Sequence, residues 1–234
     1  MNTKELCVLV GAGPGVGLAV ARRFAREGFR LALLARRSES LQSLVAVLQA
    51  EGAAADGYPV DVADFDALRR TLDEVSARAG APSVLIYNAA AATQALPSAL
   101  TATQLHRDLA VNVTGALVAA QQVLGSMRSR GKGTILFTGG GLALQPYPPL
   151  ASLAVGKAAI RSLAFSLGGE LESEGIHAAT VTIAGYVRPG TAFDPERIAE
   201  AYWRLHVEPR SEWGREIVYD EAYAAGITVR GAQL

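Results

Sequence analysis

Apolar runs and amphipathic stretches alternate along the chain. Short, nearly continuous apolar runs are typical of strands buried on both faces. Longer stretches repeat apolar residues every three or four positions, as a helix with one buried face does, and Val16, Val20 and Phe24 are the first example. Strands are expected at 6–10, 30–35, 56–62, 83–89, 133–140, 177–185 and 215–220. Helices are expected at 16–27, 38–50, 103–127, 152–173 and 195–206, with one more that Asp64 caps.

Strands that alternate with helices in this way predict an α/β protein whose parallel sheet is covered on both faces. Right-handed crossovers then give a Rossmann-like, doubly wound sheet of about seven strands. We expect a single domain over residues 1–234, because the chain shows no linker and no internal repeat. The tail 221–234 has no role that the pattern assigns.

Composition and charge narrow the class of protein. Lysine plus arginine number 22 and aspartate plus glutamate number 22, so the net charge gives no electrostatic case for nucleic acid or an anionic membrane. The strand and helix runs are shorter than the ~20 apolar residues that cross a bilayer, which predicts a cytoplasmic protein without a membrane. Cys7 is the single cysteine and is expected in the core. The three histidines, at 106, 177 and 206, fall on different elements, so no metal site is predicted.

A glycine-rich turn joins the first strand to the first helix. In "VGAGPGVGLAV", Gly11, Gly15 and Gly17 follow a G-x-x-x-G-x-G pattern. Glycines permit a tight turn and let main-chain amides approach a pyrophosphate at the start of a helix. Since the turn lies between a strand and a helix, it predicts nucleotide binding, although a glycine-rich turn without a ligand fits the same residues.

Two arginines stand where the second strand ends. A carboxylate there would bind a ribose 2′-hydroxyl, whereas an arginine accommodates a 2′-phosphate. The chain has Ala35, Arg36 and Arg37 at this point and no acid, which favours NADP(H) over NAD(H). Two solvated arginines at the start of a helix are the alternative.

Four further stretches give the chain its resemblance to the short-chain dehydrogenase/reductase family. They are Asp61-Val62, "YNAA" at 87–90, Asn112 in "LAVNVTGAL", and Lys157 with the helix that follows it. The resemblance covers essentially the whole chain and implies a small-molecule substrate and a homodimer or homotetramer. The turn, the arginines and the resemblance together predict these cofactor contacts: Gly11, Gly13, Gly15, Val16, Gly17, Arg36, Arg37, Asp61, Val62, Asn88, Ala89, Ala90, Lys157, Gly185 and Val187.

The resemblance also implies catalytic residues, and here the sequence departs from the family. Lys157 and Asn112 match the lysine and asparagine of the family's Asn-Ser-Tyr-Lys set, but Leu153 occupies the tyrosine position and Gly140 the serine position. In the family the tyrosine transfers a proton while hydride moves between cofactor and substrate. Three nearby residues are candidates to replace it: Thr138, Tyr147 and Tyr186.

Three hypotheses follow from this pattern. The first is an NADP(H)-dependent oxidoreductase with a non-standard active site, acting on a substrate that needs no strong acid, such as an activated double bond or an iminium. The second is a non-catalytic homologue that binds the cofactor as a sensor or partner subunit. The third is a non-redox enzyme that uses the same pocket for another reaction.

Overall fold

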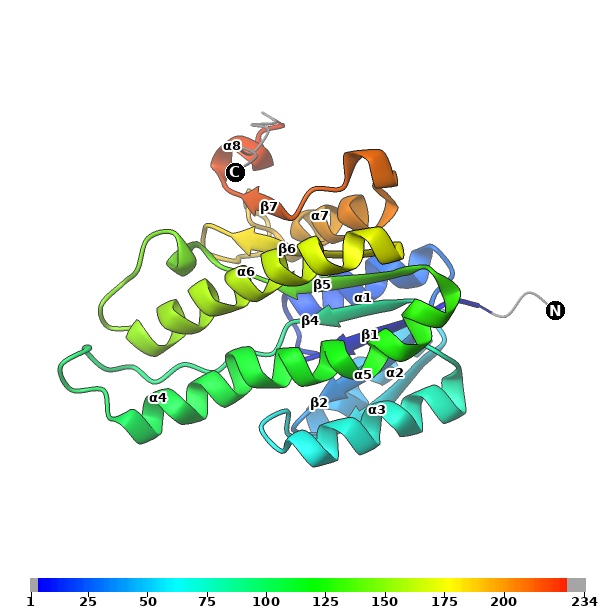
Figure 1. The fold of residues 1–234 in the computed structure, drawn as a ribbon, viewed down its shortest axis with the longest axis horizontal. Coiled ribbons are helices and arrows are strands. Elements are labelled where there is room, and N and C mark those ends of the chain that lie inside the picture. Colours follow the sequence, from blue (N-terminus) through cyan, green and yellow to red (C-terminus); the bar gives the residue numbers. More distant parts are fainter. Residues whose placement is uncertain (1–3, 227–234) are drawn as a thin grey trace.

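The computed structural model describes residues 4–226 and shows a seven-stranded, wholly parallel sheet in that part of the chain. The strand order is β3-β2-β1-β4-β5-β6-β7, with the reversal between β1 and β4 (Figure 1). This confirms the doubly wound, Rossmann-like sheet. The strands are β1 (Leu6–Val10), β2 (Arg30–Ala35), β3 (Ala55–Pro59), β4 (Val84–Tyr87), β5 (Gly133–Thr138), β6 (Ile176–Ile183) and β7 (Glu216–Tyr219).

Helices cover both faces of the sheet (Figure 1). One face carries α1 (Val16–Arg26), α2 (Ser38–Ala50) and α7 (Pro195–Val207). The other carries α3 (Phe65–Ala79), α5 (Gly115–Arg130) and α6 (Ala151–Leu171). The remaining helices are shorter: α4 (Ala102–Leu109), α8 (Glu221–Ala224), and the 3₁₀ turns η2 (Gly141–Ala143), η3 (Glu172–Glu174) and η4 (Arg210–Glu212).

Alternate residues of each strand feed two separate cores. In β1, Val8 faces the helices α3, α5 and α6, whereas Leu9 faces α1, α2 and α7. Cys7 is buried as expected, and burial raises the pKa of its thiol. Because strands of a parallel sheet all end at the same edge, the ends of β1, β4 and β5 lie side by side, and the site described below is built there.

The long helix expected at 103–127 is interrupted. Helix α4 begins with a capping box in which Thr101 and Gln104 hold each other's main chain, and the π-helix η1 (Ala110–Thr114) separates it from α5. The wide turn lets Asn112 leave the helix face and bond the main chain of Ala91. A pattern of apolar spacing does not reveal such a turn, because its cause is a contact with a distant loop.

The continuous helical stretch Ala102–Arg130 differs from expectation in a second way. By length and composition alone it passes as a membrane-spanning helix, which the inspection of apolar runs did not indicate. In the fold, 44% of its most apolar window is buried, and it packs against α3 and the sheet. The core helix of a globular domain passes the same test.

The third strand is shorter than the predicted 56–62. Strand β3 stops at Pro59, so Asp61 and Val62 lie in the loop before α3, where Asp64 caps the helix as predicted. In the tail, Asp220 caps the short helix α8. The remainder of the tail, 227–234, lies outside the described residues.

Candidate functional site

The glycine turn after β1 is shaped by the strand beside it. Gly11 has φ of +88°, a conformation that favours glycine, and a Cβ there would collide with the main chain of Ala89. The amides of Gly11 and Ala12 donate to the carbonyl oxygen of Leu34, at 2.8 and 3.0 Å, which fixes the turn. A side chain at residue 11 would therefore push β1 and β4 apart.

The turn leaves the start of α1 open. Gly13 and Gly15 have empty space where a Cβ would lie, and no side chain caps the first turn of the helix, which begins at Val16. Its first amides are thus free of side-chain partners, as a bound anion requires. Gly17 faces the amide nitrogen of Asn88 at 3.4 Å from its Cβ position, so the helix packs closely on β4. This cradle fits the pyrophosphate of a dinucleotide.

A buried chain of hydrogen bonds runs from α7 to the glycine turn. The Thr138 hydroxyl donates to Asn88 Oδ1 at 2.9 Å, and Asn88 Nδ2 donates to the carbonyl oxygen of Gly11 at 2.8 Å. Since a hydroxyl has one proton, Tyr202 Oη must donate in its 2.7 Å contact with Thr138 Oγ1. Tyr202 is fully buried, and burial raises its pKa. Thr138 therefore orders the cofactor turn, and its hydroxyl is already committed.

The two arginines expected to meet a 2′-phosphate lie at the edge of the same turn. Arg36 and Arg37 follow β2 and are exposed, with Arg37 in the N-cap position of α2. Asp61 is exposed too and accepts from the amide of Ala63, whereas Val62 is buried. All four residues lie at the carboxyl ends of β2 and β3, next to the glycine turn.

Asn112 holds the segment that follows β4. Its Oδ1 accepts from the amide of Ala91 at 2.7 Å, and its Nδ2 donates to the carbonyl oxygen of Ala91 at 2.9 Å. Helix α6 approaches so closely that a Cβ at Gly156 would collide with the Asn112 side chain. The side chain of Asn112 is thus satisfied within the fold, and it keeps the neighbouring Ala89 and Ala90 in place beside the turn.

Lys157 lies in the second turn of α6 and points to the end of β5. Its Nζ donates to the carbonyl oxygen of Thr138 at 2.6 Å, and burial lowers its pKa to about 8. A Cβ at Gly140 would lie 3.4 Å from Cγ and Cε of Lys157, an ordinary contact distance. Any side chain at residue 140 would therefore cover the lysine stem.

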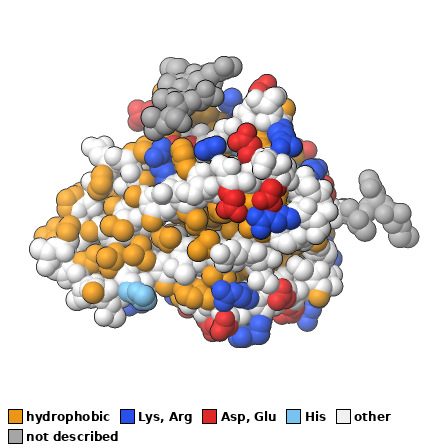
Figure 2. Space-filling model, in the orientation of Figure 1, with side chains coloured by type: hydrophobic (Ala, Val, Ile, Leu, Met, Phe, Trp, Pro, Cys, Tyr) orange, Lys and Arg blue, Asp and Glu red, His pale blue; other side chains and the backbone are white. Residues whose placement is uncertain are grey.

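Leu153 lies one turn before Lys157, and the two tyrosines that the sequence offers in its place are largely exposed. Tyr147 is 55% exposed and Tyr186 is 94% exposed, both on loops, without a side-chain hydrogen bond in the described part of the chain. In Figure 2 hydrophobic side chains gather over the end where α4 and the start of α6 protrude from the sheet. Leu153 lies in the first turn of α6, which belongs to this apolar end of the molecule.

A second buried cluster lies beside Leu153, and the sequence analysis did not find it. Asp108 of α4 is 2% exposed and accepts from the amide of Thr93 at 2.6 Å. Ser152 is fully buried and contacts the same amide, so its hydroxyl faces α4 and not the site. Burial alone would raise the pKa of Asp108, but hydrogen bonds from Ser152 and Thr93 outweigh it and lower the pKa. The signal available in the sequence was an acid four residues before Asn112, at the point where the polar start of the helix passes into an apolar run.

Beyond the end of β6 the surface is hollowed. A cavity of about 590 Å³ is lined by Gly185, Tyr186, Arg188, Phe193 and the start of α8. The ring of Phe193 packs where a Cβ of Gly185 would lie, and Val187 beside it is half-exposed. Of the predicted cofactor contacts, Gly185 lines this open hollow, and Val187 lies in the chain between its lining residues Tyr186 and Arg188.

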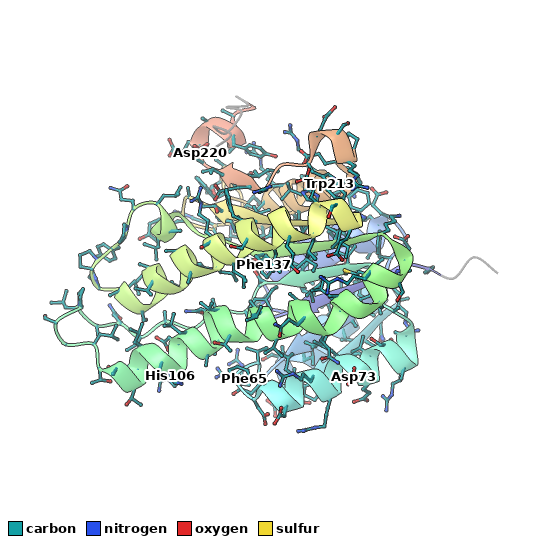
Figure 3. The ribbon with its side chains drawn as sticks, in the orientation of Figure 1. Phe65, Asp73, His106, Phe137, Trp213 and Asp220 are labelled. Atoms are coloured by element: carbon teal, nitrogen blue, oxygen red, sulfur yellow. The ribbon has the colours of Figure 1, made fainter. Side chains whose placement is uncertain are left out.

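The described residues contain no group of three or more metal-ligating side chains. Figure 3 shows His106 on α4, at the end of the molecule away from Trp213, whose indole stacks on His177. Both nitrogens of His177 contact carbonyl oxygens. His206 lies in an aromatic cluster with Phe24, and burial lowers its pKa to about 4. The histidines lie on different elements, as the sequence predicts.

The doubly wound parallel sheet and its glycine turn define a Rossmann-like α/β protein. The chain belongs to the short-chain dehydrogenase family, because the family model for short chain dehydrogenases matches residues 5–197. Members of this oxidoreductase family use nicotinamide cofactors, act on small molecules and are commonly oligomeric.

Individual relatives agree with this assignment. "Oxidoreductase asL5" of Sarocladium schorii is 33% identical over 174 residues, which are 74% of this chain and 69% of that protein. A crystal structure of a short-chain dehydrogenase from Rhodopseudomonas palustris is 28% identical, with a TM-score of 0.82 over 91% of this chain and 96% of that one. A gluconate 5-dehydrogenase from Burkholderia cenocepacia, in complex with NADP and tartrate, is 26% identical, with a TM-score of 0.78 over 86% and 88%.

Proposed function

We propose that this protein binds NADP(H) and transfers hydride between it and a small molecule, in a site that has Leu153 and Gly140 where the family has a tyrosine and a serine. The observation that carries the proposal is the connected arrangement at the ends of β1, β4 and β5. There Asn88 braces the glycine turn and Lys157 is fixed on Thr138. These parts would hold the cofactor, and their connected arrangement supports the proposal.

The cofactor would lie along the carboxyl edge of the sheet. The glycine turn and the start of α1 would hold its pyrophosphate, Asp61 and Val62 its adenine, and Lys157 its nicotinamide ribose. When bound, it supplies or accepts hydride. Ala89, Ala90, Gly185 and Val187 would wall its path. The gluconate 5-dehydrogenase, a neighbour of 26% identity, is in complex with NADP, which supports binding of NADP(H) by this chain.

Arg36 and Arg37 carry the preference for NADP(H). Both are exposed beside the cradle, and a charged hydrogen bond to a 2′-phosphate is worth about 1.5–3 kcal/mol, or about ten- to a hundredfold in affinity. Fluorescence titration should therefore show tighter binding of NADPH than of NADH. Arg36→Ala with Arg37→Ala should remove most of that difference, while Arg70→Ala, an exposed arginine of α3, should not. Tighter binding of NADH by the unaltered protein would contradict the preference.

The substrate is one whose reduction needs no strong acid from residue 153. Loss of a general acid costs about 10²–10⁴ in rate, and an activated double bond or an iminium suffers least from it. The test follows NADPH absorbance with a panel of carbonyl, enone and imine compounds. Turnover of any class supports the proposal.

A second candidate function is a non-catalytic homologue that binds NADP(H) without turning it over. Leu153 and the exposure of Tyr147 and Tyr186 favour it, because they leave the site without a fixed hydroxyl that faces Lys157. Binding of NADPH without turnover on any panel compound would select this function over the first. Failure to bind either dinucleotide would refute both. We further propose that the protein is a cytoplasmic homodimer or homotetramer, which gel filtration with light scattering would test.

A further inference from the structure

Helix α6 holds the ionisable side chain of Lys157 in the site, at the end of β5. Side chains of an α-helix lean toward its N-terminus, so the stem of Lys157 reaches back over the turn that carries Leu153. The ammonium group has three N–H donors, and the bond to the carbonyl oxygen of Thr138 uses one. Two donors are left for groups that enter the site.

The hydroxyl groups near Lys157 do not have a free proton to donate to a substrate. Thr138 gives its proton to Asn88 within the buried chain of hydrogen bonds. Ser152 faces Asp108 and Thr93 and is fully buried. The neighbouring hydroxyl protons are therefore used elsewhere, whereas Lys157, one turn after Leu153, has N–H groups beyond the one that bonds Thr138.

The surroundings of Lys157 contain few charges. The packed elements η1, η2 and β5 carry no ionisable side chain, and β6 carries only His177, near its start. Helix α4 carries His106, Arg107 and Asp108, and the last of these is bonded to Thr93. Arg161 lies one turn further along α6 and pairs with Glu216 of β7 at 2.6 Å. Glu172 and Glu174 belong to η3, at the other end of α6. The adjoining loops carry Tyr147 after β5, and Tyr186, Arg188 and Asp194 after β6; Asp194 accepts from the amides of Gly190 and Glu196.

We propose that Lys157 itself passes the proton to the substrate, without an intervening tyrosine, and that the substrate is a neutral conjugated carbonyl compound. The proposal rests on the proposed oxidoreductase function. A cationic iminium would be repelled by an ammonium that has no carboxylate partner within 4 Å among the described residues. A carbonyl that develops negative charge on oxygen would be attracted and stabilised.

The proton step balances without another reactant. Addition of hydride to the β-carbon forms a C–H bond and moves the electron pair of the conjugated system onto the carbonyl oxygen. That oxygen forms an O–H bond with the proton of Nζ, the N–H bond breaks, and Lys157 is left as a neutral amine. The enol then converts to the ketone in water, and solvent protonates the amine again. Burial lowers the pKa of Lys157 to about 8, which suits an acid working near neutral pH.

The ionisation of Lys157 can be measured without turnover. The chain has three lysines, Lys4, Lys132 and Lys157, so protein labelled with ¹³C at lysine Cε gives a spectrum that Lys157→Arg assigns by loss of one resonance. We expect that resonance to titrate with a midpoint of about 8 in the free protein. The titration is repeated in the complex with NADPH, which is the form that meets the substrate, to give the midpoint relevant to catalysis.

Kinetics then separate proton transfer from cofactor binding. At saturating NADPH, kcat/KM for an enone should fall tenfold per pH unit above the midpoint of the NADPH complex, because only the ammonium donates. Lys157→Arg keeps the charge but cannot release a proton near pH 8. It should lower kcat by about 10²–10⁴ and flatten this profile, with the Kd for NADPH changed by less than tenfold. Methylammonium should restore at least tenfold activity to Lys157→Ala, and Lys132→Arg should change nothing.

The outcomes separate the two proposals. If Lys157→Arg keeps kcat within threefold and retains the alkaline fall, the role of Lys157 is refuted while the oxidoreductase function stands. A Cε resonance that does not move between pH 7 and 9.5 refutes it as well. If the unaltered protein binds NADPH but reduces no carbonyl, enone or imine compound, the oxidoreductase function fails and this inference fails with it; reduction of simple carbonyls without enones refutes this inference alone. Reduction of imines alone would refute the choice of substrate.

Discussion

Tyr202→Phe tests whether the buried chain of hydrogen bonds has the direction given above. The change removes the Tyr202 hydroxyl and leaves the ring, so it creates almost no cavity in a fully buried site. One hydrogen bond between neutral groups is lost, at about 1–1.5 kcal/mol of unfolding free energy. For a chain of this size that is a fall in Tm of about 2–6 °C. Thr138 still donates to Asn88, so the Kd for NADPH should change less than threefold.

Thr138→Val is the contrasting variant. It removes both hydrogen bonds of the hydroxyl and leaves Asn88 Oδ1 and Tyr202 Oη without their partner. Two unsatisfied buried groups cost about 2–4 kcal/mol. Because Asn88 then loses its orientation on the carbonyl oxygen of Gly11, NADPH binding should weaken by about tenfold or more. Thr138→Ser keeps the hydroxyl and is the matched control.

Urea unfolding, thermal melts and NADPH titrations of these variants, combined as a double-mutant cycle, give the coupling between Tyr202 and Thr138. We expect about 1 kcal/mol, since the two share one hydrogen bond. A coupling below 0.3 kcal/mol would show that the 2.7 Å contact carries no stability. Weaker NADPH binding in Tyr202→Phe than in Thr138→Val would reverse the inferred direction of donation.

Three further predictions concern the site. Leu153→Tyr combined with Gly140→Ser should raise the rate of reduction of simple ketones by about 10²–10⁴ in a steady-state assay. The backbone of Gly140 is extended and accepts serine, and a Cβ there would meet Lys157 at an ordinary contact distance. No gain in rate would mean that the site has diverged further. Gly11→Ala should abolish detectable NADPH binding in titrations, since it forces φ of +88° on alanine and a collision with β4, and retention of wild-type affinity would contradict that geometry. Asp108→Asn should destabilise the protein at pH 7 in urea unfolding. The lowered pKa of Asp108 gives stability that is present above about pH 4 and lost as the pH falls through the folded-state pKa, so the difference from wild type should shrink in acid; a constant difference from pH 7 to 3 would refute it.

The apolar pattern was sufficient for the elements of the sheet, and it failed where distant residues meet. The strands at 6–10 and 30–35 and the helix at 38–50 match the structure, because their apolar faces are set locally by burial. The interruption at 110–114 depends on the contact between Asn112 and Ala91, which no local pattern encodes. Likewise, Thr138 looked like a free hydroxyl at a strand end.

The group that donates to the Thr138 hydroxyl belongs to Tyr202, 64 positions further along the chain. Helix geometry alone predicts that Ser152 points away from the site. Its hydrogen bonds with Asp108 and Thr93 could be identified only from the folded structure. Sequence periodicity therefore predicted the strands and helices that carry the site. The hydrogen-bond partners of its polar side chains depended on tertiary contacts and could not be predicted in this way.

The π-turn η1 sets the rotation of α4 relative to α5. Each residue advances an α-helix by about 100°, so removing one residue from 110–114 would turn α4, and Asp108 with it, by about that angle. Asp108 would then leave Thr93 and Ser152, and the loop after β4 would lose a hold that is independent of the glycine turn. The extra residue of the π-turn thus gives α4 the rotation about the helix axis that brings Asp108 to Thr93, which a regular α-helix would not give.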